Sequence, residues 1–135
     1  MGTVTGRGTA VVLVVEEDRE MRSLLFDEFW SVGCRLREAK DGDDAVQAVL
    51  QSMPDVILTD LRISAGGIAY IGRLRAVAPG CPIIVMTAFG DRGIRSEVMT
   101  AGADAYFDKP VRIAELKACV QQLLLKHEGA MPRGT

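Results

Sequence analysis

Acidic, hydroxyl and ammonium side chains follow short apolar runs at four places far apart in the chain. These residues are Glu16, Glu17, Asp60, Thr87 and Lys109. Carboxylates, a hydroxyl and a lysine around a divalent cation suit phosphoryl transfer, because charge on the equatorial oxygens of the transferred group must be neutralised. A carboxylate can act as the nucleophile by forming an aspartyl phosphate. The residue types therefore predict that Asp60 accepts a phosphoryl group, provided that the fold brings the four places together.

A cation is expected because several carboxylates would share a small volume. Two such charges about 5 Å apart repel by roughly 3 kcal/mol at an effective dielectric constant near 20. Ligands that are all oxygen atoms, with few protein contacts, favour Mg²⁺ or Mn²⁺ over zinc or copper. The predicted cofactor is therefore Mg²⁺ (or Mn²⁺).

The elements that must position these residues are visible in the hydrophobic pattern. Strands are expected at 11–15, 34–38, 56–59, 83–86 and 105–107. Helical stripes are expected at 21–32, 45–50, 68–78, 94–101 and 113–124. Strands that alternate with helices imply an α/β fold, (βα)5, with a parallel sheet covered on both faces. Ligands of such sheets bind beyond the carboxyl ends of the strands, where these chemical groups stand.

Length and composition limit the classes of protein to which this chain could belong. The 135 residues suit one domain, and a net charge of −2 gives no overall attraction to nucleic acid or to an anionic membrane. Three widely spaced cysteines without a C-x-x-C pair favour reduced thiols in a cytoplasmic protein. No apolar run is long enough to span a membrane. We expect a flexible arm at 1–9, the domain at 10–127, and a flexible tail or linker at 128–135.

Four segments together resemble the receiver domain of two-component response regulators. They are VVLVVEEDREMR, PDVILTDLR, PIIVMTA and GADAYFDKP, in that order along residues 10–125. The resemblance implies a doubly wound, flavodoxin-like (CheY-like) fold with five parallel strands in the order 2-1-3-4-5. It also implies that the phosphoryl donor is a histidine kinase or a histidine phosphotransfer protein.

The resemblance assigns the metal site and the phosphoacceptor. It implies that Asp60 is the phosphoacceptor and a metal ligand, that Glu17 binds Mg²⁺ directly, and that Glu16 acts largely through water. The backbone carbonyl of Arg62 would be the third protein ligand. Lys109 would pair with the phosphoryl group.

Further roles follow from the same resemblance. The peptide bond between Lys109 and Pro110 would be cis. Thr87 and Tyr106 resemble a switch pair, in which the hydroxyl moves toward the phosphate and the ring turns inward. This change would reshape the surface of the fourth helix, fifth strand and fifth helix, through which a homodimer could form. The domain would assist its own phosphorylation and dephosphorylation without being an enzyme, and would bind neither nucleic acid nor membrane directly.

Two positions depart from the family pattern. Glu17 stands where the family usually has aspartate, and the extra methylene moves the carboxylate outward by roughly 1.5 Å. Mg²⁺ demands near-ideal octahedral geometry, so its affinity could fall. The segment 63–67 is one residue shorter than usual and lacks the common proline and Asp-Gly. These departures leave open a degenerate receiver that binds partners without taking phosphate.

Two enzymes or cofactor binders of the same architecture would need residues that this chain does not have. A haloacid-dehalogenase-type phosphatase would need an acid two residues after its nucleophile, where Arg62 stands, and a flavodoxin-like cofactor binder would need a phosphate loop where Glu16 and Glu17 would repel phosphate. Asp18 is expected to be a helix cap and His127 to lie at a helix C-terminus. Solvated helix faces are expected for Arg73, Arg75, Arg92 and Arg95.

Overall fold

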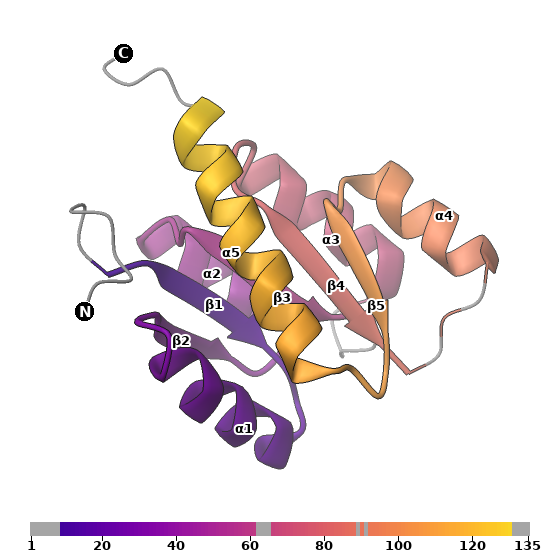
Figure 1. The fold of residues 1–135 in the computed structure, drawn as a ribbon. Helices are drawn as coiled ribbons and strands as arrows, with labels where there is room; N and C mark the ends of the chain where they lie inside the picture. Colours follow the sequence, from indigo (N-terminus) through magenta and orange to yellow (C-terminus); the bar gives the residue numbers. More distant parts are fainter. Residues whose placement is uncertain (1–8, 62–65, 89, 91, 131–135) are drawn as a thin grey trace.

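The computed structural model describes residues 9–61, 66–88, 90 and 92–130. Among these residues, five strands alternate with five helices (Figure 1). The strands are β1 (Val11–Val15), β2 (Arg35–Ala39), β3 (Val56–Asp60), β4 (Ile83–Thr87) and β5 (Ala105–Asp108). The helices are α1 (Arg19–Trp30), α2 (Gly42–Gln51), α3 (Gly67–Val77), α4 (Arg92–Ala101) and α5 (Ile113–Ala130).

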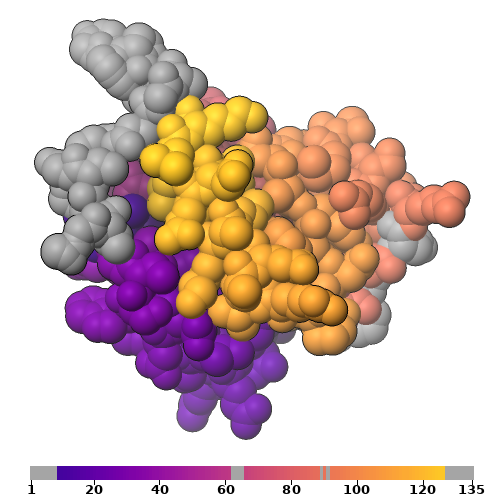
Figure 2. Space-filling view, viewed as in Figure 1, coloured from indigo at the N-terminus to yellow at the C-terminus, as the bar shows by residue number. Residues whose placement is uncertain are grey.

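The strands form one sheet in the order β2-β1-β3-β4-β5, and every neighbouring pair is parallel. Helices α1 and α5 cover one face, and α2, α3 and α4 cover the other (Figure 1). The space-filling view in Figure 2 shows α5 lying across the first face beside α1. The predicted doubly wound fold and its strand order are confirmed. The order of the strands reverses between β1 and β3, so the carboxyl ends of these strands flank the expected ligand crevice.

Two core layers lie on the two faces of the sheet. Because successive side chains of a strand point to opposite faces, Leu13 and Val15 join the layer under α2, α3 and α4. Val12 and Val14 join the layer under α1 and α5. All four are completely buried, as expected for a central strand with helices on both sides.

The starts of the helices differ in how they are capped. The side chain of Asp18 accepts hydrogen bonds from the backbone N–H groups of Glu20 and Met21, so its predicted role as the cap of α1 is confirmed. Asp41 caps α2 in the same way. The cap position of α3 is Gly66, which has φ 114° and offers no side-chain hydrogen bond. Side-chain capping thus secures the starts of α1 and α2 but not that of α3.

The end of the chain is more helical than expected. Helix α5 continues to Ala130, three residues beyond 127, and His127 lies in its last turn. Residues 1–8 of the expected arm and 131–135 of the expected tail lie outside the described residues. In the part of the chain that is described, no helix combines the length and apolar character needed to cross a bilayer.

The prediction for Arg75 was wrong, because this side chain is partly buried and does not lie on a solvated face. Its guanidinium forms an ion pair with Asp104 at 2.8 Å. It also donates hydrogen bonds to the backbone carbonyls of Ala78, Pro79, Cys81 and Gly102. Arg75 therefore joins the end of α3 to the segments that precede β4 and β5. Arg73, by contrast, is exposed and pairs with the exposed Asp43.

Candidate functional site

Three charged residues from three different strand ends meet at the carboxyl edge of the sheet. Glu16 follows β1, Asp60 ends β3 and Lys109 follows β5. The Nζ atom of Lys109 lies 2.8 Å from Oε1 of Glu16 and 3.0 Å from Oδ2 of Asp60. The fold therefore brings together the ammonium and the two carboxylates that stand far apart in the sequence.

The two carboxylates are buried and held in place. Glu16 is 2% exposed and Asp60 is 8% exposed. The second oxygen of Glu16, Oε2, accepts a hydrogen bond from the backbone N–H of Asp18 at 3.0 Å, and the backbone carbonyl of Glu16 accepts one from Nη1 of Arg22. Both carboxylate oxygens of Glu16 thus accept a hydrogen bond. The contact with Arg22 is one that the sequence pattern did not reveal.

The charge state of Lys109 follows from these neighbours. Burial by itself would lower the pKa of Lys109. Hydrogen bonds to Glu16 and Asp60, and the negative charges of both, outweigh burial and raise the pKa above its ordinary value. Lys109 is therefore a fixed positive charge at neutral pH.

The expected gathering of three carboxylates around a cation is not seen among the described residues, and the set of metal ligands stays a prediction. No group of three or more histidine, cysteine, aspartate or glutamate side chains lies there in a metal-holding arrangement. Glu17 is exposed, and the ammonium of Lys109 contacts both Glu16 and Asp60, so it already relieves the repulsion that was assigned to a cation. The backbone carbonyl of Arg62 lies outside the described residues.

The carboxylate oxygens at this edge of the sheet are nevertheless the type of ligand that Mg²⁺ binds. Mg²⁺ usually keeps several waters and is held by one or two carboxylates together with phosphate oxygens, rather than by a cage made only of protein groups. Asp60 and Glu17 offer carboxylate oxygens at the edge where a phosphate would bind. A site of this kind does not need three converging carboxylates.

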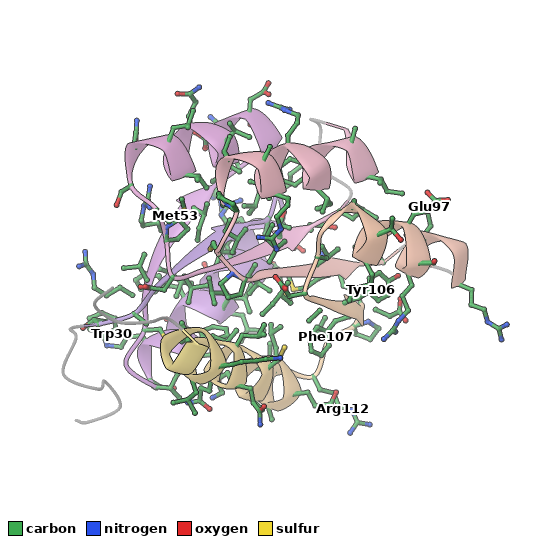
Figure 3. The ribbon with its side chains drawn as sticks, turned by 90° about the horizontal axis from the view of Figure 1, so that it is seen from above. Trp30, Met53, Glu97, Tyr106, Phe107 and Arg112 are labelled. Carbon is green, nitrogen blue, oxygen red and sulfur yellow. The ribbon has the colours of Figure 1, made fainter. Side chains whose placement is uncertain are left out.

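The two residues of the expected switch pair lie on neighbouring strands. Thr87 ends β4 and is 1% exposed, and its backbone carbonyl accepts a hydrogen bond from the N–H of Lys109 at 2.8 Å. Tyr106 lies on β5, two positions before the residue paired with Thr87. Figure 3 shows Tyr106 on the α4 side of β5 and Phe107 on the opposite side. The peptide bond between Lys109 and Pro110 is cis.

Tyr106 makes contacts that sequence reasoning missed. It is buried, and its hydroxyl donates a hydrogen bond to Oδ1 of Asp108 at 3.0 Å. The guanidinium carbon of Arg95 lies 5.3 Å from the centre of its ring, within the range of a cation–π interaction. A Cβ atom added at Gly90 would overlap the tyrosine hydroxyl. The spacing of Tyr106 and Asp108 by two residues on a strand could have indicated their contact, because such residues share a face.

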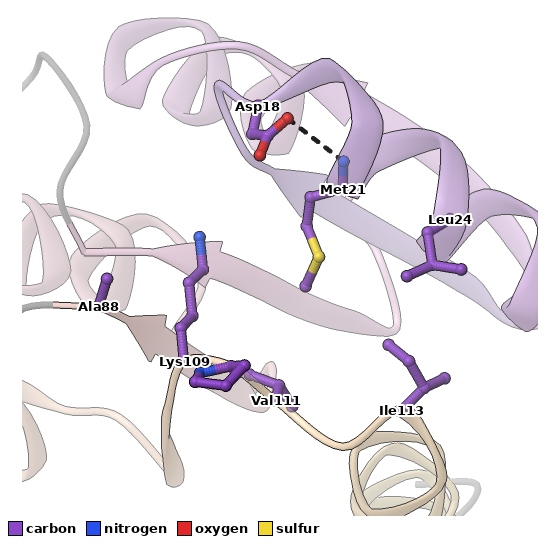
Figure 4. Close-up of a pocket in the computed structure, with 8 residues that line it drawn as sticks. Asp18, Met21, Leu24, Ala88, Lys109, Val111 and Ile113 are labelled. Carbon is purple, nitrogen blue, oxygen red and sulfur yellow. Dashed lines mark hydrogen bonds between the residues drawn. The ribbon is translucent and has the colours of Figure 1, made fainter.

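A hollow of about 490 Å³ opens beside the site (Figure 4). Its walls come from the start of α1 and from the segment that joins β5 to α5. The lining residues are Asp18, Met21, Leu24, Ala88, Lys109, Pro110, Val111 and Ile113. Most of these side chains are apolar, and Lys109 connects the hollow to the two buried carboxylates.

Comparison with known proteins identifies the family. A model of the response regulator receiver domain matches residues 12–121. The chain belongs to this family. The predicted recognition is confirmed, and the chain is a receiver domain of the kind found in two-component response regulators.

Individual relatives show the same likeness. The chain is 33% identical over 119 residues to the virulence transcriptional regulatory protein PhoP of Shigella flexneri, covering 87% of this chain and 53% of that protein. It therefore spans about half the length of PhoP. It is 30% identical over 114 residues to sporulation initiation phosphotransferase F of Bacillus subtilis, covering 84% of this chain and 92% of that protein.

Solved structures agree with the fold. The receiver domain of a sensor histidine kinase from Pseudomonas aeruginosa PAO1 superposes with a TM-score of 0.78 at 28% identity, covering 87% of this chain and 98% of that one. That structure is described as having a magnesium ion coordinated in the active site cleft. A CheY-like receiver domain protein from Methanospirillum hungatei superposes with a TM-score of 0.87 at 18% identity, covering 92% of this chain and 100% of that one.

Proposed function

We propose that this receiver domain accepts a phosphoryl group on the carboxylate of Asp60. The observation that carries the proposal is the contact between Nζ of Lys109 and Oδ2 of Asp60 at 3.0 Å, in a buried corner at the carboxyl edge of the sheet. This contact places an ammonium group directly beside the carboxylate that would act as the nucleophile. The same ammonium can then neutralise charge on the oxygens of the incoming phosphoryl group.

The donor in this proposal is a phosphohistidine of a histidine kinase or phosphotransfer protein. An oxygen of Asp60 forms a bond to phosphorus while the bond between phosphorus and the donor imidazole nitrogen breaks, and the imidazole leaves with the electron pair and takes a proton. The product is an aspartyl phosphate. In this proposal the hydroxyl of Thr87, which ends the strand between those of Asp60 and Lys109, would donate a hydrogen bond to one phosphoryl oxygen.

Magnesium in this proposal would be held by Asp60 and Glu17, with Glu16 acting through water and the backbone carbonyl of Arg62 completing the protein ligands. When bound, Mg²⁺ supplies positive charge that offsets the charge of the phosphoryl oxygens. The chemistry of the carboxylate donors and the magnesium described in the Pseudomonas receiver structure support this assignment. The domain assists its own phosphorylation and dephosphorylation but turns over no separate substrate.

The hollow beside Lys109 supports docking of the donor at this edge. The donor histidine must come within bonding distance of Asp60, so the surface around it must cover the neighbouring hollow. Met21 and Leu24 on one side, and Val111 and Ile113 on the other, offer apolar contacts to such a surface. A helical donor that presents its histidine above Lys109 fits this arrangement.

We further propose that phosphorylation shifts a two-state equilibrium of Thr87 and Tyr106 and so changes the surface of α4, β5 and α5. This surface would be the output of the domain, either to a protein partner or to a second copy in a homodimer, without direct contact with nucleic acid or membrane. The three free thiols, Cys34, Cys81 and Cys119, support a reducing, cytoplasmic location.

The test is incubation of the purified chain with acetyl phosphate and Mg²⁺, followed by intact-mass measurement. We expect a gain of about 80 Da, the mass of one phosphoryl group, that requires Mg²⁺ and disappears in Asp60→Asn. Asp43→Asn, which changes an exposed carboxylate on α2, is the matched control and should gain the same mass. A wild-type chain that gains no mass, or a gain that survives Asp60→Asn, would overturn the proposal.

A further inference from the structure

A buried tyrosine hydroxyl reaches the strand that carries Asp60. Tyr70 lies in the first turns of α3 and is completely buried. Its hydroxyl oxygen lies 3.0 Å from Oγ1 of Thr59, which is also completely buried. Thr59 directly precedes Asp60, and its hydroxyl donates a hydrogen bond to the backbone carbonyl of Asp60 at 3.0 Å. Tyr70 is thus linked to the peptide of the proposed phosphoacceptor.

The direction of this link follows from the number of available protons. Each hydroxyl has a single hydrogen to donate. Because the Thr59 hydroxyl donates to the carbonyl of Asp60, the Tyr70 hydroxyl must donate to Thr59. Burial raises the pKa of Tyr70 well above its ordinary value, so the tyrosine keeps the proton that this hydrogen bond needs. Two hydrogen bonds therefore run in one direction and end on Asp60.

The link compensates for the start of α3, which lacks a side-chain cap. Only six residues, 61–66, separate the end of β3 from the start of α3. Gly66 offers no capping side chain, and the first turn of α3 has no acidic residue. Tyr70 connects this helix directly to the sheet, one turn after the uncapped start. The packing of this core layer needs only an aromatic ring at position 70, whereas the buried hydroxyl needs a partner of its own.

We propose that Tyr70 and Thr59 are a positioning pair, whose hydrogen bonds hold Asp60 in the orientation needed for phosphoryl transfer. The inference rests on the proposed phosphorylation of Asp60. The Asp60 carboxylate must face both Lys109 and the incoming phosphorus atom. Small displacements of a reacting group slow transfer strongly, even when they originate away from the reacting atoms. The two hydroxyls reach Asp60 at its backbone carbonyl, so both would act through the backbone of Asp60.

The test uses variants that remove one hydroxyl with little change of shape. Tyr70→Phe and Thr59→Val each remove one, and Thr59→Ser keeps it. We measure the maximal rate constant of phosphorylation, the half-saturating concentration of acetyl phosphate, and the Tm. We expect Tyr70→Phe and Thr59→Val to lower the maximal rate constant about fivefold, the effect of one hydrogen bond, at an unchanged half-saturating concentration. The double variant should be no slower than either single one, and Thr59→Ser should keep most of the rate.

The control separates positioning from stability. Val49→Ala shortens a buried side chain of the same core layer near the end of α2. It should lower Tm without lowering the maximal rate constant. Wild-type rates in Tyr70→Phe and Thr59→Val, whatever their Tm, would overturn the positioning role. If the wild-type chain itself takes no phosphoryl group, the proposed function fails first, and the inference fails with it.

Discussion

Replacing Lys109 by methionine would remove the ammonium that contacts two buried carboxylates, those of Glu16 and Asp60. Nζ lies 2.8 Å from Oε1 of Glu16 and 3.0 Å from Oδ2 of Asp60, so these oxygens lie no more than 5.8 Å apart, the sum of the two distances. At that separation and an effective dielectric constant near 20, two unit charges repel by about 3 kcal/mol. Since Glu16 is 2% exposed, water cannot readily replace the ammonium. We expect Lys109→Met to lower the free energy of unfolding by about 3 kcal/mol.

The assay is urea unfolding followed by circular dichroism at neutral pH without divalent cations. Lys117→Met is the matched control, because Nζ of Lys117 lies 2.9 Å from Oε1 of Glu28 in a more exposed ion pair. It should lose less than about 1 kcal/mol. Adding Glu16→Gln to Lys109→Met removes one of the two charges and should recover most of the loss. Mg²⁺ should stabilise Lys109→Met more than wild type, because a bound cation relieves the same repulsion.

The refuting result is clear. If Lys109→Met unfolds at the same urea concentration as Lys117→Met, the two carboxylates do not repel as their distances require. If Glu16→Gln brings no recovery, the loss has a source other than the charge of Glu16. Either result would remove the electrostatic argument for the role of Lys109.

Three further predictions follow from contacts described above. Arg75→Ala should lower the free energy of unfolding by about 3 kcal/mol, because its charged guanidinium donates hydrogen bonds to several carbonyls. Arg73→Ala, on the same helix, should lower it by less than about 1 kcal/mol. Urea unfolding of the two variants measures the difference. Gly90→Ala should displace the ring of Tyr106, since the new methyl group overlaps its hydroxyl, and the ring resonances of Tyr106 should shift in NMR spectra of the folded protein. Burial raises the pKa of Cys81 to about 12, so this thiol should resist alkylation at pH 8 in the folded protein, as peptide mapping can show. Equal alkylation of Cys81 in the folded and the unfolded protein would contradict this protection. The contribution of the protonated thiol to the free energy of unfolding is fully present below pH 9.0 and is lost as the pH rises from there toward 12.

The fold and the centre of the site could be predicted because they depend on repeating patterns. Short apolar runs that alternate with longer amphipathic segments are typical of parallel strands buried on both faces by helices. Parallel strands place their carboxyl ends at one edge, so Asp60 and Lys109 could be brought together without any knowledge of side-chain conformations. The two residues indeed meet, at 3.0 Å.

The contacts that were missed depend on the reach and direction of individual side chains. Arg75 looked like any charged residue on a helix, because no sequence pattern shows that it reaches the backbone carbonyls of the segments that follow α3 and α4. The difference in burial between the neighbours Glu16 and Glu17, one buried and the other exposed, could not be read from the sequence either. The hydroxyls of Tyr70 and Thr59 could not be paired from the sequence, since both positions suited an apolar core. These side-chain contacts can be identified only from the three-dimensional structure.

The bond between Lys109 and Asp60 joins two strands that are not neighbours. In the sheet β4 lies between β3 and β5, and the bond passes over its end at Thr87. A group bound to the carboxylate of Asp60 would therefore compete for the ammonium of Lys109. This ammonium fixes the start of the segment after β5, which lies beside the segment after β4. Phosphorylation of Asp60 could in this way change the conformation of both segments. No long-range rearrangement of the sheet would be needed to pass this change to the surface.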